Sequence, residues 1–191
     1  MKQNKLIIVF ALLIITGALC RIFPLSPFGL YGFAPQLAMA VFGGAVLSDK
    51  KWAFAVPLFS MLLSDAIFEG LYRAGYTSLA GFYDGQWINY LLIAAITFIG
   101  IAMRRINVTN IAAGSIAAPV LFFLASNLVT WLGHGGYQRP MTGSGLFQAY
   151  LDGVPFLYGS LAGTVFFSAA LFGIWAAIKS TYSKTPRHAT A

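Results

Sequence analysis

The stretch FFLASNLVTWLGHGGYQ, residues 122 to 138, indicates the fold of this chain. It begins as an apolar helix and ends in glycines, a histidine and a tyrosine, so it reads as a membrane span that leads into a loop. Asn127 and Trp131 lie one helical turn apart where the composition changes. Residues four apart share one face of a helix, so we expect the amide and the indole to point the same way.

The composition extends this interpretation to the whole chain. Of its 191 residues, 59% are hydrophobic and 9% are charged, against about 25% charged residues in soluble domains. Each membrane span needs about 20 apolar residues, so residues 1–191 fit a single membrane domain. We predict an all-α integral membrane protein, a compact bundle of six transmembrane helices with long outer loops. The predicted spans are 6–23, 34–48, 52–72, 87–103, 111–132 and 154–178.

The second of these segments, 34–48, is short and rich in small residues. It could cross the bilayer tightly packed against its neighbours or bend within it, and we expect it to cross. Ala40, Gly43 and Gly44 would allow close approach of helices, where van der Waals packing replaces the missing hydrophobic force.

Basic residues predict the topology. Nine of the twelve fall on the side of the termini, against Arg21, Arg73 and Arg139 on the other side. By the positive-inside rule both termini are cytoplasmic, in a multi-pass protein of the cell inner membrane. The net charge of +7 therefore reflects topology and contact with the lipid bilayer, and we predict no nucleic-acid partner.

The predicted outer loops, 24–33, 73–86 and 133–153, are long and aromatic. They could form a cap over a site or an interfacial aromatic belt. In the last of them we predict a short amphipathic helix near 144–152, which Gly153 and Pro155 break before the final span.

Asp65 is the strongest polar signal within a span. It lies fourteen residues after Lys51, or about 21 Å along the helix, and Glu69 follows on the same face. Ionisable groups at such depth are functional candidates. The alternative is that Asp65 only bonds a neighbouring helix, through Arg21 or Arg73.

Asp65 and Asn127 are predicted at one level beneath the aromatic loops. Polar groups that converge in an apolar hollow are typical of a small-molecule pocket, while hydrogen bonding between helices is the rival interpretation. His134 has no second histidine at ligand spacing, because His188 lies in the opposite tail. We therefore predict no metal and no cofactor, and without a catalytic motif we predict no enzyme.

Four stretches carry a resemblance: LCRIFP, PQLAMAVFGGAVLSDKKWAFAVPLFSMLLSD, FFLASNLVTWL and GLFQAYLDGVPFLYGSLAGTVFFSAALFG. They resemble a bacterial six-helix membrane family of unassigned function, whose design is similar to the S components of energy-coupling factor (ECF) vitamin transporters. This likeness is one of size, topology and site placement.

The resemblance implies capture of a small vitamin-like nutrient in an outward-facing pocket and its release inward with an ATPase and transmembrane energising module. The pocket residues that it implies are Asp65, Asn127, Trp131, Tyr137 and Tyr150. The first segment lacks the AxxxA docking motif of many S components, and Ala40 with Gly44 offer the nearest substitute. The alternative function is a structural or accessory subunit of a larger membrane complex, with no small-molecule substrate.

Overall fold

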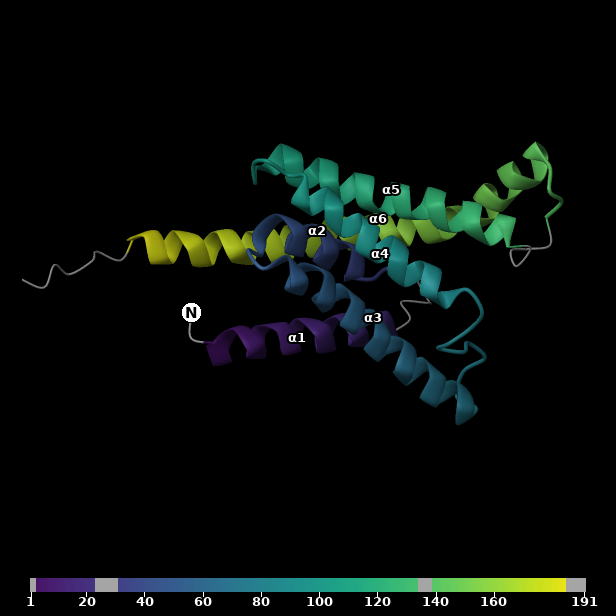
Figure 1. Cartoon of the computed structure of the whole chain (residues 1–191), viewed down its shortest axis with the longest axis horizontal. Helices are drawn as coiled ribbons and strands as arrows, with labels where there is room; N and C mark the ends of the chain where they lie inside the picture. Colours follow the sequence, from purple (N-terminus) through teal and green to yellow (C-terminus); the bar gives the residue numbers. More distant parts are fainter. Residues whose placement is uncertain (1–2, 23–30, 134–138, 185–191) are drawn as a thin grey trace, which may run out of the picture.

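The computed structural model describes residues 3–22, 31–133 and 139–184, and these residues form an all-helical bundle without strands (Figure 1). Each helix overlaps one of the six segments predicted from the sequence, so the all-α class is confirmed. The helices are α1 (Gln3–Ile22), α2 (Gln36–Val46), α3 (Lys50–Arg73), α4 (Gln86–Ile101), α5 (Val108–Leu132) and α6 (Gly143–Lys184).

Helix α2 forms the centre of the bundle. Eight of its eleven residues are buried, and it packs against α3, α4, α5 and α6. Ala40 and Val41 are fully buried in a core that also contains Met61, Ile93 and Phe172. At 1.5 Å per residue α2 is only about 16 Å long, roughly half the thickness of the hydrocarbon layer.

Glycines bring α2 and α4 into backbone contact. A Cβ atom added at Gly100 would overlap the carbonyl oxygen of Val41, and one added at Gly44 would lie 2.8 Å from the backbone nitrogen of Ile101. Gly43 faces the backbone of α3 in the same way. The expectation that small residues here permit close helix approach is therefore confirmed.

The short connection between α2 and α3 satisfies the ends of both helices. The last carbonyl groups of a helix lack partners within it. Lys50 Nζ donates hydrogen bonds to the carbonyl oxygens of Gly44 (2.8 Å) and Leu47 (2.7 Å), and its positive charge suits the C-terminus of α2. Asp49 accepts a hydrogen bond from the Lys51 backbone N–H (3.0 Å) and caps the start of α3.

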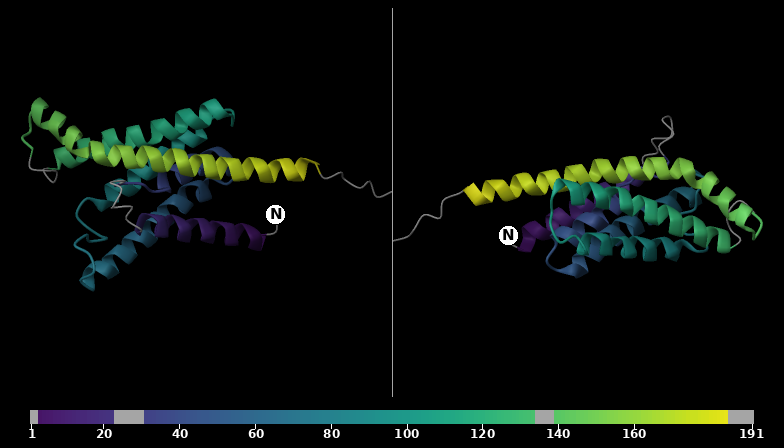
Figure 2. Two further views of the ribbon diagram at one scale, coloured as in Figure 1. Left: turned by 180° about the vertical axis from the view of Figure 1, so that it is seen from behind. Right: turned by 90° about the horizontal axis from the view of Figure 1, so that it is seen from above.

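Helix α6 corrects one expectation. The sequence predicted a short helix at 144–152 that ends at Gly153 and Pro155, whereas a single helix continues from Gly143 to Lys184. A proline inside a helix removes one backbone hydrogen bond and can bend the helix without ending it. Figure 2 shows this bend: the first turns of α6 lie at an angle to the long remainder of the helix.

Within the described residues, three helices are long and apolar enough to cross a membrane: α3, α5 and α6 up to Ser180. Their outward faces carry large exposed apolar side chains such as Phe59, Leu121 and Phe166. Contiguous apolar surface of this kind is rare on soluble monomers. The chain therefore has the character of a membrane protein.

Successive helices run in alternate directions. The start of α1, the end of α6, and the α2–α3 and α4–α5 connections share one end of the bundle, at the left of Figure 1. The connection from residue 74 to 85 lies at the opposite end, at the right. We call these the terminal end and the loop end.

Candidate functional site

A buried carboxylate links three helices near the loop end. Asp65, on α3, is 1% exposed. Its Oδ1 accepts a hydrogen bond from Arg21 Nη1 at the end of α1, and its Oδ2 accepts from Gln86 Nε2 (2.5 Å) and Tyr90 Oη (2.5 Å) on α4. A buried charge is tolerated only when it is paired and hydrogen-bonded, and three donors meet that requirement here.

Arg21 is the more accessible partner of the pair. Its side chain is 28% exposed, and its Nη1 also donates to Ser64 Oγ (2.6 Å). The guanidinium carbon lies 5.8 Å from the centre of the Phe68 ring, within the range of a cation–π contact. Because Asp65 and Phe68 both belong to α3, they fix the guanidinium against that helix. The Asp65 cluster denotes Arg21, Ser64, Asp65, Gln86 and Tyr90.

Further polar residues connect this cluster to the surface. Asn89 Nδ2 donates to Gln86 Oε1 (3.2 Å) and to Tyr83 Oη (2.9 Å). Tyr83 itself is 54% exposed. A hydrogen-bonded chain therefore leads from the buried carboxylate through α4 to the loop end.

The connection between α3 and α4 is held down beside the cluster. Glu69 Oε1 accepts from Arg73 Nε (2.7 Å), and Glu69 Oε2 accepts from the Phe82 backbone N–H (3.3 Å). A Cβ atom at Gly81 would overlap the carbonyl oxygen of Asp65, so only glycine fits against α3 at that point. Glu69 therefore fixes the loop, and its contacts do not include the cluster.

A second group of polar and aromatic residues lies between α5 and α6. Trp131 Nε1 donates to the carbonyl oxygen of Pro140 (3.0 Å), and Tyr150 Oη donates to that of Leu124 (3.1 Å). Asn127 Nδ2 donates to the Phe123 carbonyl oxygen (2.8 Å). We call Asn127, Trp131 and Tyr150 the α5–α6 cluster.

Close packing surrounds the α5–α6 cluster. Gly153 lies against the amide group of Asn127, where a Cβ atom would overlap it. The ring centroids of Phe123 and Tyr150 are 5.7 Å apart. Arg139 Nε and Nη2 donate to the two oxygens of Asp152 (2.8 and 3.1 Å), and these bonds raise the pKa of Arg139 above its ordinary value.

The structure thus divides the predicted site residues. Asn127 and Tyr150 lie where α5 packs against α6, and Trp131 binds Pro140 just before α6. Asp65 instead contacts α1 and α4. Tyr137, like His134, lies outside the described residues. Of the two partners considered for Asp65, Arg21 makes the ion pair and Arg73 binds Glu69.

Gln86 and Tyr90 were not predicted as site residues from the sequence. Both lie in the first turns of α4, four residues apart and so on one helical face. In the printed sequence QWINY this spacing was visible, and the pairing with Asp65 was not, because it depends on how α4 packs against α3.

Among the described residues there is no group of three or more His, Cys, Asp or Glu side chains that could hold a metal ion. The Asp65 cluster offers a fixed guanidinium, a carboxylate, an amide and a phenol. Such groups can recognise a polar or anionic ligand by hydrogen bonds and charge.

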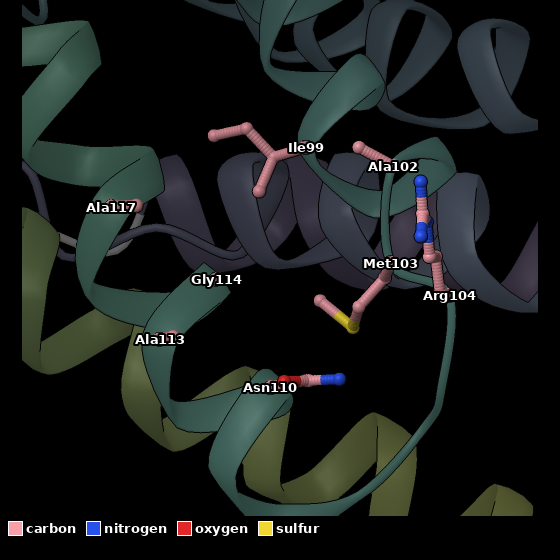
Figure 3. Close-up of a pocket in the computed structure, with 8 residues that line it drawn as sticks. All are labelled: Ile99, Ala102, Met103, Arg104, Asn110, Ala113, Gly114 and Ala117. Atoms are coloured by element: carbon pink, nitrogen blue, oxygen red, sulfur yellow. The ribbon is translucent and has the colours of Figure 1, made fainter.

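A hollow of about 530 Å³ lies elsewhere, at the terminal end between α4 and α5. Figure 3 shows its lining, with Arg104 and Asn110 beside the apolar Met103 and Ile99. It lies at the opposite end of α4 from Gln86 and Tyr90.

Comparison with known proteins places the chain in a family. Residues 1–187 match a family of unknown function, DUF6580, and the chain belongs to it. No curated protein and no solved structure matched the sequence.

Proposed function

We propose that this DUF6580 protein captures a small vitamin-like nutrient for uptake, in the manner that its resemblance to ECF S components implies. In this proposal six helices cross the bacterial inner membrane, the termini are cytoplasmic and the loop end faces outward. The alternating helix directions support it, as do the basic residues at the terminal end: Lys50 and Lys51 at the start of α3, and Arg104 and Arg105 between α4 and α5. The Asp65 cluster is the observation on which the function depends.

The energetic cost of burying charge supports a functional role for the Asp65 cluster. Moving two charges out of water costs several kcal/mol per ion, and a well-packed apolar pair of similar volume is often as stable or more so. Stability therefore gives little reason for Arg21 and Asp65 in an apolar bundle. Charged residues inside membrane proteins commonly belong to substrate or ion pathways, which is the role we assign to this pair.

Within the proposed site, Arg21 contacts the ligand and Asp65 orients Arg21. Asp65 is 1% exposed and its oxygens already accept three hydrogen bonds. Arg21 Nη1 is also engaged, but among the described residues its Nε and Nη2 donate no hydrogen bond. An acceptor group of the nutrient would bind there, and Asn127, Trp131, Tyr137 and Tyr150 would supply amide and aromatic contacts from the side of α5 and α6.

An ATPase and transmembrane energising module would complete transport. Ala40 is fully buried and Gly44 packs against the backbone of α4. The suggested substitute for the missing docking motif therefore faces the interior of the bundle. Docking would have to use other surface residues.

Native mass spectrometry of the gently extracted protein tests this function. We expect a bound small molecule on the wild type and on Arg73→Gln, whose ion pair with Glu69 is exposed, and its loss from Arg21→Gln. Equal occupancy of all three proteins, or no small molecule on any folded sample, would contradict the proposal.

The second candidate function is a structural or accessory subunit. It is favoured by the complete set of donors around Asp65, since hydrogen bonds between helices alone can explain polar residues in a membrane protein. Obligate copurification with larger membrane partners, without a bound small molecule, would support this alternative.

A further inference from the structure

The hollow between α4 and α5 leads to an inference that goes beyond nutrient uptake. We propose that it binds an anionic phospholipid of the leaflet at the terminal end. The phosphate group lies at Arg104 and Arg105, and one acyl chain lies between the two helices. This lipid site is independent of the Asp65 cluster, which lies near the loop end.

Small residues on α5 create the space. Ala113, Gly114 and Ala117 line the hollow on one side, and Ile99 and Met103 line it on the other. A Cβ atom at Gly114 would approach Met103 Cε to 2.8 Å, so the glycine leaves room for the flexible thioether beside the cavity. The hollow has a volume of about 530 Å³ and is largely open to the surroundings of the bundle. The walls are therefore apolar and suited to hydrocarbon.

Lipid has access to this hollow from the side. Ala102, which lines the hollow at the end of α4, is exposed. Ala113, on the hollow itself, is exposed as well. An acyl chain can therefore enter from the surrounding bilayer without any movement of the core.

Arg104 lines the hollow, and Arg105 follows it in the connection between α4 and α5. Arg104 and Arg105 are both exposed, and neither side chain has an ion-pair or hydrogen-bond partner within the described ranges. Asn110 Nδ2 donates to the backbone carbonyl oxygen of Arg105 (2.8 Å) and so fixes the connection between the helices. In Figure 3, Arg104 stands at one edge of the cavity and Asn110 at the other.

Apolar walls beside exposed arginines favour an anionic lipid over other occupants. Guanidinium groups bind phosphate through paired hydrogen bonds, and basic pockets between helices on the cytoplasmic side are typical sites for anionic head groups. The five acidic residues of the chain lie outside this connection, so charge complementarity excludes a cationic ligand. A free phosphate would leave the apolar walls unused.

The test compares lipid retention by native mass spectrometry after reconstitution in vesicles. The vesicles contain phosphatidylcholine with phosphatidylglycerol as the anionic probe. We expect the wild type to retain phosphatidylglycerol in preference to phosphatidylcholine, and the preference to fall about five-fold for each of Arg104→Gln and Arg105→Gln. Arg73→Gln, which removes an exposed arginine near the loop end, is the matched control and should retain the wild-type preference.

A second variant tests the acyl-chain part of the site. Ala113→Phe fills the hollow from an exposed position, so it should fold normally and should lose bound phosphatidylglycerol while both arginines remain. Retention that is unchanged in Ala113→Phe and in the Arg104→Gln/Arg105→Gln double variant would overturn the proposal. Equal loss in Arg73→Gln would also overturn it, because the effect would then follow total charge. Neither result depends on whether the protein transports a nutrient.

Discussion

Removal of Arg21 should destabilise the bundle, and a second substitution at Asp65 should restore part of the lost stability. In Arg21→Met the carboxylate of Asp65 stays 1% exposed but keeps only Gln86 Nε2 and Tyr90 Oη as donors. Breaking a buried ion pair by removing one partner costs about 3–5 kcal/mol. We expect a loss of this size in the free energy of unfolding.

The double variant Arg21→Met/Asp65→Asn removes the unpaired charge and keeps an acceptor for Gln86 and Tyr90. The new amide N–H group can donate to Ser64 Oγ, which Arg21 no longer occupies. We therefore expect the double variant to be about 2 kcal/mol more stable than Arg21→Met alone, since an unpaired buried charge is the largest penalty removed. This non-additivity is the signature of the ion pair.

These free energies of unfolding can be measured in mild detergent. The bound fraction of any ligand is followed in parallel. Arg73→Met is the control: its partner Glu69 is on the same helix, but the Arg73 side chain is 78% exposed, so we expect no measurable change. If the double variant proves less stable than Arg21→Met, the unpaired carboxylate is not the source of the loss. That outcome would refute this account of the ion pair.

Other parts of the bundle yield further predictions. Gly100→Ala should cost about 1–3 kcal/mol of unfolding free energy, because its new methyl group meets the α2 backbone, while thermal melts of Gly173→Ala, which meets no atom within 4 Å, should show no loss. Trp131→Ala should weaken ligand retention in native mass spectrometry more than it lowers the melting temperature, and an equal loss of both would make Trp131 a core residue. In a cysteine-free background, an impermeant reagent should label cysteine at Ser144 in intact cells and at Ser183 only after lysis. Equal labelling of both would contradict the six-span topology.

Hydropathy and residue spacing predicted an apolar segment for each of the six helices. A span is a local property of about 20 residues, and helices α3 and α5 begin and end within three residues of the predicted segments. The pairing of Asp65 was also visible as one of two alternatives. Pro155 was misread because a proline lowers helix propensity in any context, and sequence alone does not show that packing of α6 maintains the helix through the bend.

The neighbours of each polar residue could not be predicted in the same way. Counting along a helix gives the depth of a side chain in the bundle, but it does not give the direction in which that side chain points. Asp65 and Asn127 were assigned similar depth and therefore one pocket. Their hydrogen bonds instead involve α4 for Asp65 and α5 itself for Asn127, which depends on the rotation of whole helices.

The length of α2 determines where the Asp65 cluster lies relative to the central helix. Its C-terminus is fixed at the terminal end by Lys50, and at the other end Gln36 Nε2 donates to Ser60 Oγ (3.3 Å). Ser60 is ten residues into α3, or about 15 Å from the terminal end, so the central helix begins near mid-depth. Asp65 lies five residues further along α3, or about 7 Å beyond that level. Asp65 and its partner Arg21 therefore lie beyond the start of α2, on the side of the loop end.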